Sequence, residues 1–305
     1  MIDPAFPLCE LHRHLDGSLR PSTLRELAAR HGRPVPGDLL FFPGMGLAEA
    51  LDRFSFTLSL LQEPEVVCRV AAEICEDAAQ EGVTTLEIRF APQLHRGADP
   101  ASIVDAALAG VAGRAGLVLC GLYGEPPAVL HGLVRLAADR PGVVGLDLAG
   151  GPAGGPGWSM CDYGPAFREA AAFGLGRTVH AGEGRPPAEI RTAVEELGAQ
   201  RIGHGTTLLQ DPSVRDLLVE RQITVEACVT SNWHVGAIPA PDAHPLPAWL
   251  KAGVRAGVCT DNTLLSAVDA VEEHRRVAAL PGMTPELLAR AVSWGHAGAF
   301  RREAR

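Results

Sequence analysis

Eight short apolar or β-branched runs recur along the chain, and segments with helical spacing separate them. Two of these segments, Pro64 to Glu81 and Pro187 to Leu197, have the composition and the proline starts of helices. Strands that alternate with helices pair in parallel. The pattern therefore predicts an α/β fold, a (β/α)8 TIM barrel. The eight runs are Leu8 to Leu11, Val83 to Phe90, Leu117 to Tyr123, Val143 to Leu148, Gly176 to His180, Arg201 to Gly203, Thr224 to Cys228 and Val254 to Cys259.

The length of 305 residues suits one barrel of roughly 250 residues with insertions. The chain has no linker, no low-complexity segment and no repeat beyond the β/α alternation, so we expect a single domain over residues 1–305. Residues 33–61 form the clearest insertion, in which three prolines precede a helical stretch rich in Phe and Leu. We expect this insertion to cap the barrel mouth and the active site.

Composition limits the classes of partner. The net charge is −9 and there is no basic run, which argues against nucleic acid or an anionic membrane surface as a partner. The N-terminus has no basic segment followed by a long apolar one, and no stretch approaches the roughly 20 apolar residues of a membrane span. We expect a cytoplasmic protein that acts on a small molecule. Its oligomeric state leaves no trace in the sequence.

Polar side chains follow several of the apolar runs. His12 and His14 lie two residues apart at a strand end, so both project from one face of the strand. His180 ends another run, and Glu183 comes three positions later. An HxH pair alone would also fit two polar residues at the end of a strand. The further residues with the same placement favour a metal site instead, because imidazole is a common ligand for zinc and iron.

Two more candidates complete this set. His204 closes a short strand, and Asp261 and Asn262 follow the last one. Three histidines and an aspartate make an N3O donor set for one divalent ion, with a position left open for water, which is what a catalytic site requires. A barrel gathers the ends of all its strands on one face, so residues this dispersed can meet there.

Five segments resemble, in order and spacing, the motif series of the adenosine deaminase family of amidohydrolase barrels. The stretches 81–92 and 231–237 also resemble that family, and the resemblance spans about residues 8 to 270. The five segments are Leu11-His12-Arg13-His14-Leu15-Asp16-Gly17-Ser18, Leu146-Asp147-Leu148-Ala149-Gly150, His180-Ala181-Gly182-Glu183, Gly203-His204-Gly205 and Thr260-Asp261-Asn262.

The resemblance implies that His12, His14, His180 and Asp261 hold one zinc ion per chain, whose bound water becomes a nucleophile. Related barrels bridge two metals with a carboxylated lysine from the fourth strand. Lys251 is the only lysine here and precedes the eighth strand, so a lysine-bridged pair is excluded and a mononuclear site is favoured.

The resemblance also implies catalytic roles for three residues. Glu183 would protonate N1 of a 6-aminopurine, which makes C6 electrophilic. His204 would face the attacking water and stabilise or orient it, and Asp261 would accept its proton.

Substrate contacts follow from the same resemblance. Gly150 would offer its backbone NH to the purine N3, Asp16 would bond a ribose hydroxyl, and His14 would also contact the substrate. Asn262 departs from the commonest family pattern, where a second aspartate donates to the purine N7 when protonated. An amide donates the same bond without a perturbed pKa. Asp16 has a second interpretation as a turn aspartate before Gly17.

The function that these residues predict is zinc-dependent hydrolytic deamination of a 6-aminopurine nucleoside, with adenosine as the default substrate and ammonia as a product. The alternatives are 6-aminodeoxyfutalosine, an adenine-bearing menaquinone precursor, and a free aminopurine base. A third possibility is a barrel that binds nucleosides without catalysis. Glu183 and His204 argue against it, because a binder needs no general acid beside a water-activating ion.

Overall fold

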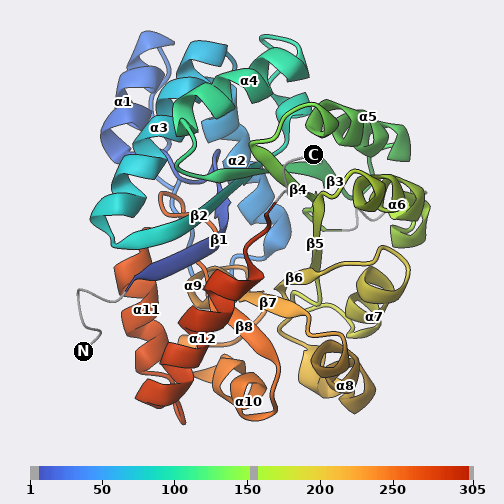
Figure 1. Ribbon diagram of the computed structural model, residues 1–305. Helices are drawn as coiled ribbons and strands as arrows, with labels where there is room; N and C mark the ends of the chain where they lie inside the picture. Colours follow the sequence, from blue (N-terminus) through green and yellow to red (C-terminus); the bar gives the residue numbers. More distant parts are fainter. Residues whose placement is uncertain (1–6, 152–156, 302–305) are drawn as a thin grey trace.

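The computed structural model describes residues 7–151 and 157–301. Its centre is a sheet of eight strands in the order β1 to β8, and every neighbouring pair runs parallel (Figure 1). The last strand returns to the first at a bridge between Arg13 and Asp261, where backbone hydrogen bonds of 2.8 Å join His12 and His14 to Asp261. The strands are β1 (Leu8–His14), β2 (Val83–Phe90), β3 (Gly116–Leu122), β4 (Val143–Ala149), β5 (Gly176–Ala181), β6 (Arg201–His204), β7 (Thr224–Ala227) and β8 (Arg255–Val258).

The (β/α)8 barrel predicted from the apolar runs is confirmed. The main difference is β1, which continues past the predicted end at Leu11 to His14, so that both residues of the HxH pair belong to the strand. The two helices predicted by range are confirmed as α3 and α7, with ends that differ by one or two residues.

Helices surround the strands and connect them (Figure 1). Many begin with proline at the first position, where the missing NH costs nothing. The α-helices are α1 (Pro21–Arg30), α2 (Leu47–Leu60), α3 (Pro64–Gln80), α4 (Pro100–Val111), α5 (Pro127–Ala138), α6 (Gly164–Ala172), α7 (Ala188–Glu195), α8 (Pro212–Glu220), α9 (Val229–His234), α10 (Leu246–Lys251), α11 (Ala270–Ala278) and α12 (Pro285–Gly298). Short 3-10 helices are η1 (Pro92–Leu94), η2 (Met160–Tyr163), η3 (Leu208–Gln210) and η4 (Pro241–Ala243). Among the described residues, none of these helices combines the length and apolarity needed to cross a membrane.

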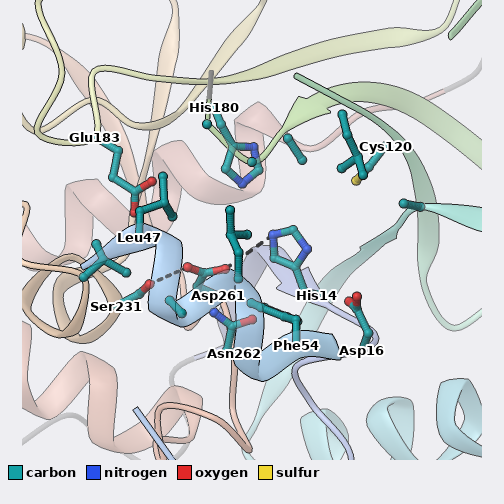
Figure 2. Close-up of a pocket in the computed structure, with 18 of the residues that line it drawn as sticks. His14, Asp16, Leu47, Phe54, Cys120, His180, Glu183, Ser231, Asp261 and Asn262 are labelled. Atoms are coloured by element: carbon teal, nitrogen blue, oxygen red, sulfur yellow. Dashed lines mark hydrogen bonds and ion pairs between the residues drawn. The ribbon is translucent and has the colours of Figure 1, made fainter. Parts of the chain in front are cut away.

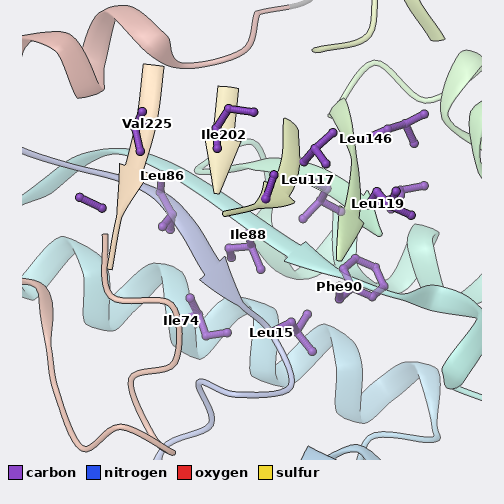
Figure 3. Packing of buried hydrophobic residues seen from close by; sticks show 14 of the residues in the cluster. Leu15, Ile74, Leu86, Ile88, Phe90, Leu117, Leu119, Leu146, Ile202 and Val225 are labelled. Carbon is purple, nitrogen blue, oxygen red and sulfur yellow. The ribbon is translucent and has the colours of Figure 1, made fainter. Parts of the chain in front are cut away.

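The outer face of the barrel wall is apolar. Leu86, Ile88 and Phe90 alternate along β2 and belong to one large buried cluster (Figure 3). Leu146 of β4 and Val225 of β7 join the same cluster. Successive strand residues point to opposite faces, so this layer lies between the strands and the helices.

The inner face of the same strands carries charged residues. Glu87 and Arg89 occupy the alternate positions of β2, Asp147 follows Leu146 in β4, and Glu226 follows Val225 in β7. All four side chains are buried. Buried charges must be paired, and here they pair across the barrel axis below the site described next.

Candidate active site

A cavity of about 390 Å³ opens at the carboxyl ends of the strands, within the size range of small-molecule sites (Figure 2). His12 lies just behind its wall and is fully buried. The structure thus brings all nine site residues predicted from sequence into one place. The other eight line the cavity: His14, Asp16, Gly150, His180, Glu183, His204, Asp261 and Asn262.

Four histidine rings from three strands form the base of the site. The ring centroid of His12 lies 4.6 Å from that of His180, 4.9 Å from that of His204 and 5.2 Å from that of His14. Burial lowers the pKa of His12, His14 and His204 well below the ordinary value. Neutral imidazoles keep a nitrogen lone pair available for a metal ion.

Among the residues that the structure describes, three groups of donor atoms lie close enough to hold one ion, with the atoms of each group within 4.8 Å of one another. One joins His12, His14 and Asp261, and a second joins His12, His180 and His204. The four ligands implied by the resemblance are therefore shared between two groups that meet at His12. The third group joins His204, Cys228 and Asp261, so the buried Cys228 thiol lies beside the same donor atoms, a position that sequence analysis did not identify.

Carboxylates behind the histidines fix their orientation. The Nδ1 atom of His12 lies 2.7 Å from Oε2 of Glu226, and Nδ1 of His180 lies 3.0 Å from Oδ2 of Asp147. The buried Nε2 of His12 has no hydrogen-bond partner. A carboxylate on one ring nitrogen sets the tautomer and leaves the other nitrogen as a metal ligand, so the arrangement fits a metal ion in front of these rings.

Arg89 joins the two supporting carboxylates. Its guanidinium donates to Asp147 Oδ2 and to Glu226 Oε2, both at 2.8 Å, and all three side chains are fully buried. Burial alone would raise the pKa of Asp147, but His180 and Arg89 lower it below the ordinary value. Asp147 is therefore an anion that can orient His180.

Asp261 is held in a strained backbone conformation. Its φ is +64° and that of His204 is +68°, both in the left-handed region that a non-glycine residue rarely occupies. Such strain gathers at functional sites. Ser231 Oγ donates to Asp261 Oδ2 at 2.5 Å, while Oδ1 lies 3.4 Å from His14 Nε2 and 3.5 Å from His12 Nε2. Asp261 therefore turns one oxygen towards the histidines.

Glu183 follows β5 and points into the cavity opposite Asp16 (Figure 2). Its Oε1 lies 3.5 Å from Nδ1 of His204, and Asn232 Nδ2 lies 2.9 Å from the same nitrogen. Burial raises the pKa of the Glu183 carboxyl. A raised pKa favours the protonated form of the carboxyl group, which is the form that a general acid requires.

The other wall of the cavity offers polar groups without protein partners. Asp16 Oδ1 and Asn262 Oδ1 are buried and make no hydrogen bond. A Cβ on Gly17 would come within 2.2 Å of Asn262 Oδ1, so only glycine lets this amide approach the chain so closely. Gly150 has a φ of +76°, which glycine adopts without strain.

The cavity entrance is apolar. Within α2, part of the predicted insertion, Leu47, Phe54 and Leu58 line the cavity, and the Phe54 ring meets that of His14 at 5.9 Å between centroids. Among the described residues that line the cavity there is no lysine or arginine.

Sequence analysis assigned no role to the residues that support the ligands. Glu226, Asp147 and Arg89 each stand alone between apolar residues in a strand. That pattern is the signal that could have found them, because a charge buried inside a barrel needs a partner. Ser231 and Asn232 belong to a segment with family likeness, but their contacts with Asp261 and His204 depend on tertiary structure.

Three comparisons bear on family membership. The adenosine deaminase of Klebsiella pneumoniae is 34% identical over 326 residues, which cover 99% of this chain and 96% of that protein. The N6-mAMP deaminase of Arabidopsis is 26% identical, with a TM-score of 0.87 and coverage of 98% and 95%. An amidohydrolase of Burkholderia ambifaria with bound Zn is 25% identical, with a TM-score of 0.84 and coverage of 98% and 87%. The family model described as adenosine deaminase matches residues 7–305. The chain therefore belongs to the adenosine deaminase family.

Proposed function

We propose that the protein is a zinc-dependent aminohydrolase that converts adenosine to inosine and releases ammonia. The observation that carries the proposal is the meeting, in one cavity, of the histidine and aspartate donors with Glu183 and His204. A barrel that only binds nucleosides would need neither a buried carboxyl with a raised pKa nor strained residues beside a cluster of imidazoles.

His12, His14, His180 and Asp261 would hold one zinc ion. The free Nε2 of His12 and the carboxylates on the far nitrogens of His12 and His180 support this assignment. The bound Zn in the Burkholderia neighbour supports it further. When bound, zinc supplies water acidic enough to act as a nucleophile near neutral pH.

The protein's own residues would carry the protons. Glu183 would donate a proton to ring N1, which draws electrons from C6; the raised pKa of its buried carboxyl supports this role. His204 orients the attacking water, and Asp261 accepts its proton. Asp261 would then return that proton to the amino group, which leaves C6 as ammonia. The C6 hydroxyl would give its proton back to Glu183 as the carbonyl forms.

Three polar groups would place the nucleoside. Gly150 offers its NH to N3, Asn262 donates from its amide to N7, and Asp16 accepts from a ribose hydroxyl. His14, which lines the same cavity, would also contact the substrate. The unpartnered oxygen of Asp16 supports this role, since a buried acceptor without a donor is costly. It also favours a nucleoside over a free base.

The residues that line the cavity favour a nucleoside over a nucleotide. A buried phosphate needs cationic partners, and no lysine or arginine belongs to the described lining. The Arabidopsis neighbour is named for a nucleotide substrate, so this chain would differ from it at the 5′ end. The comparisons do not favour 6-aminodeoxyfutalosine.

Residues 33–61, as part of one domain, would cap the nucleoside through α2.

An ultraviolet assay of a small panel tests this proposal, because deamination at C6 shifts the absorbance. The panel contains adenosine, adenine and AMP at equal concentration with zinc-loaded protein. We expect adenosine to give the highest catalytic efficiency. Faster turnover of adenine would favour the free-base alternative, and faster turnover of AMP would contradict the argument from the cavity lining.

A further inference from the structure

The described residues that follow α12, 299–301, lie over the floor of the barrel, opposite the cavity. The chain leaves this helix and crosses in front of the ring of strands (Figure 1). The half-buried ring of Phe300 then lies over the guanidinium of Arg201, with 3.6 Å between the ring centroid and Cζ. Arg201 itself is only 1% exposed. The aromatic ring therefore stands between solvent and a buried cation.

Two strands make room for this ring. A Cβ on Gly176 would come within 2.1 Å of Phe300, and one on Gly145 within 2.7 Å. Real Cβ atoms do not approach so closely, so any other residue at these positions would displace the ring. The backbone NH of Phe300 also donates to Glu87 Oε1 at 2.6 Å. The two glycines and the hydrogen bond to Glu87 therefore define the position of the Phe300 ring at the floor of the barrel.

Arg201 connects the Phe300 ring to the carboxylates buried inside the barrel. Its guanidinium donates to the carbonyl of Gly298 at 3.0 Å, and it forms ion pairs with Glu87 Oε2 at 2.5 Å and Glu226 Oε1 at 2.7 Å. Arg201 therefore contacts both the C-terminal segment, through Gly298, and the buried carboxylates inside the barrel.

Glu226 carries the connection to the active site. Its Oε1 faces Arg201 and accepts from Thr178 Oγ1 at 2.9 Å, while its Oε2 lies 2.7 Å from His12 Nδ1. A continuous path of contacts runs from Phe300 through Arg201 and Glu226 to His12, from the floor of the barrel to its mouth.

We infer that Phe300 is a positioning residue for the metal site: its ring seals the floor and keeps the contact between Arg201 and Glu226 dry, which holds His12 in place. This role rests on the zinc site of the proposed function. A cleft of about 710 Å³ beside the segment is lined by Phe300, Arg201 and Arg255 among others. Arg201 already borders this cleft but is only 1% exposed, so loss of the ring would expose more of its guanidinium, and water would weaken its ion pair with Glu226.

The experiment compares the full-length variants Phe300→Ala and Phe300→Leu with the wild type, and measures zinc release to a chelator and the unfolding midpoint. Loss of an outer partner of a metal ligand typically costs about 10- to 100-fold in metal affinity. Because Phe300 acts through two further residues, we expect Phe300→Ala to lose roughly tenfold in zinc affinity, at the low end of that range, and to release zinc to the chelator faster than the wild type. Phe300→Leu keeps an apolar cover and should retain most of the wild-type affinity.

Trp294→Ala is the matched control. It removes a half-buried aromatic ring and its cation-π contact with Arg290 from the same helix, 4.5 Å between centroid and Cζ, without touching Arg201. We expect a lower unfolding midpoint with wild-type zinc release. Wild-type release by Phe300→Ala would overturn the inference, as would equally fast release by Phe300→Leu or Trp294→Ala. A wild-type protein that binds no zinc would instead refute the proposed function.

Discussion

One face of the barrel wall buries apolar side chains, and the other buries charged ones. Leu146 and Asp147 are neighbours in β4, yet Leu146 packs in the apolar layer under the helices while Asp147 binds Arg89 and His180 inside the barrel. In β2, Ile88 likewise packs in the apolar layer, while Arg89 binds Glu226 inside the barrel. The outer face holds the fold together without touching the site. The inner face is an ion-pair network that contacts the histidines proposed to bind metal.

The difference has an energetic cause. Burying an apolar side chain is favourable on its own. A buried ion pair gains little over an apolar packing of the same shape, but removing one partner leaves an unpaired charge. The inner network is therefore explained by its support of His12 and His180 rather than by stability. Variants on the two faces should therefore show which residues affect activity, which affect metal binding and which affect only stability.

Glu183→Gln should have the largest effect, and on activity alone. The amide keeps the size of the side chain but has no proton to transfer, and general acid catalysis contributes about 10²- to 10⁴-fold. We expect turnover of adenosine to fall by that factor while zinc content and the unfolding midpoint stay at the wild-type level. Near-normal turnover in a zinc-loaded variant would mean that the acid lies elsewhere.

Arg89→Met should damage both stability and metal binding. The variant leaves Asp147 and Glu226 as buried carboxylates without their shared cation. Breaking a buried pair in this way costs about 3–5 kcal/mol of unfolding free energy. Denaturant unfolding and zinc release should both change. If stability falls while zinc release is unaltered, the network does not position the histidines.

Leu146→Ala should affect stability alone. The side chain is fully buried in the outer layer, where a leucine truncation costs about 2–5 kcal/mol. Zinc release and the KM for adenosine should stay unchanged in the folded fraction. Comparable loss of zinc in Leu146→Ala and Arg89→Met would show that the two faces are not functionally distinct.

The smallest effect concerns Asn262. If its amide donates to N7, 7-deazaadenosine leaves the amide unpaired, at a cost of about 1–3 kcal/mol. We expect catalytic efficiency roughly ten- to a hundredfold below that for adenosine. Asn262→Ala should process both nucleosides poorly and about equally. Equal rates in the wild type, or an unchanged preference in the variant, would exclude this contact and reopen the substrate class.

The apolar residues of the outer face could be predicted from the sequence, but most of the contacts on the inner face could not. Runs such as Val83 to Phe90 show their apolar periodicity locally, so the strands and the barrel could be predicted. The motif residues could be assigned because their order resembles a known family. Glu226 and Arg201 carry no local motif, and their partners are 214 and 114 residues away, at His12 and Glu87. Such pairings exist only once the barrel closes.

The most direct test of the account is a titration of zinc into metal-free protein, with bound metal and adenosine deamination measured on the same samples. Activity should rise with occupancy and level off at about one zinc per chain, the capacity of a mononuclear N3O site. His12→Ala and His180→Ala should bind zinc weakly and stay inactive across the titration. Full activity in the metal-free protein, or activity that appears only with a second tightly bound ion, would contradict the account.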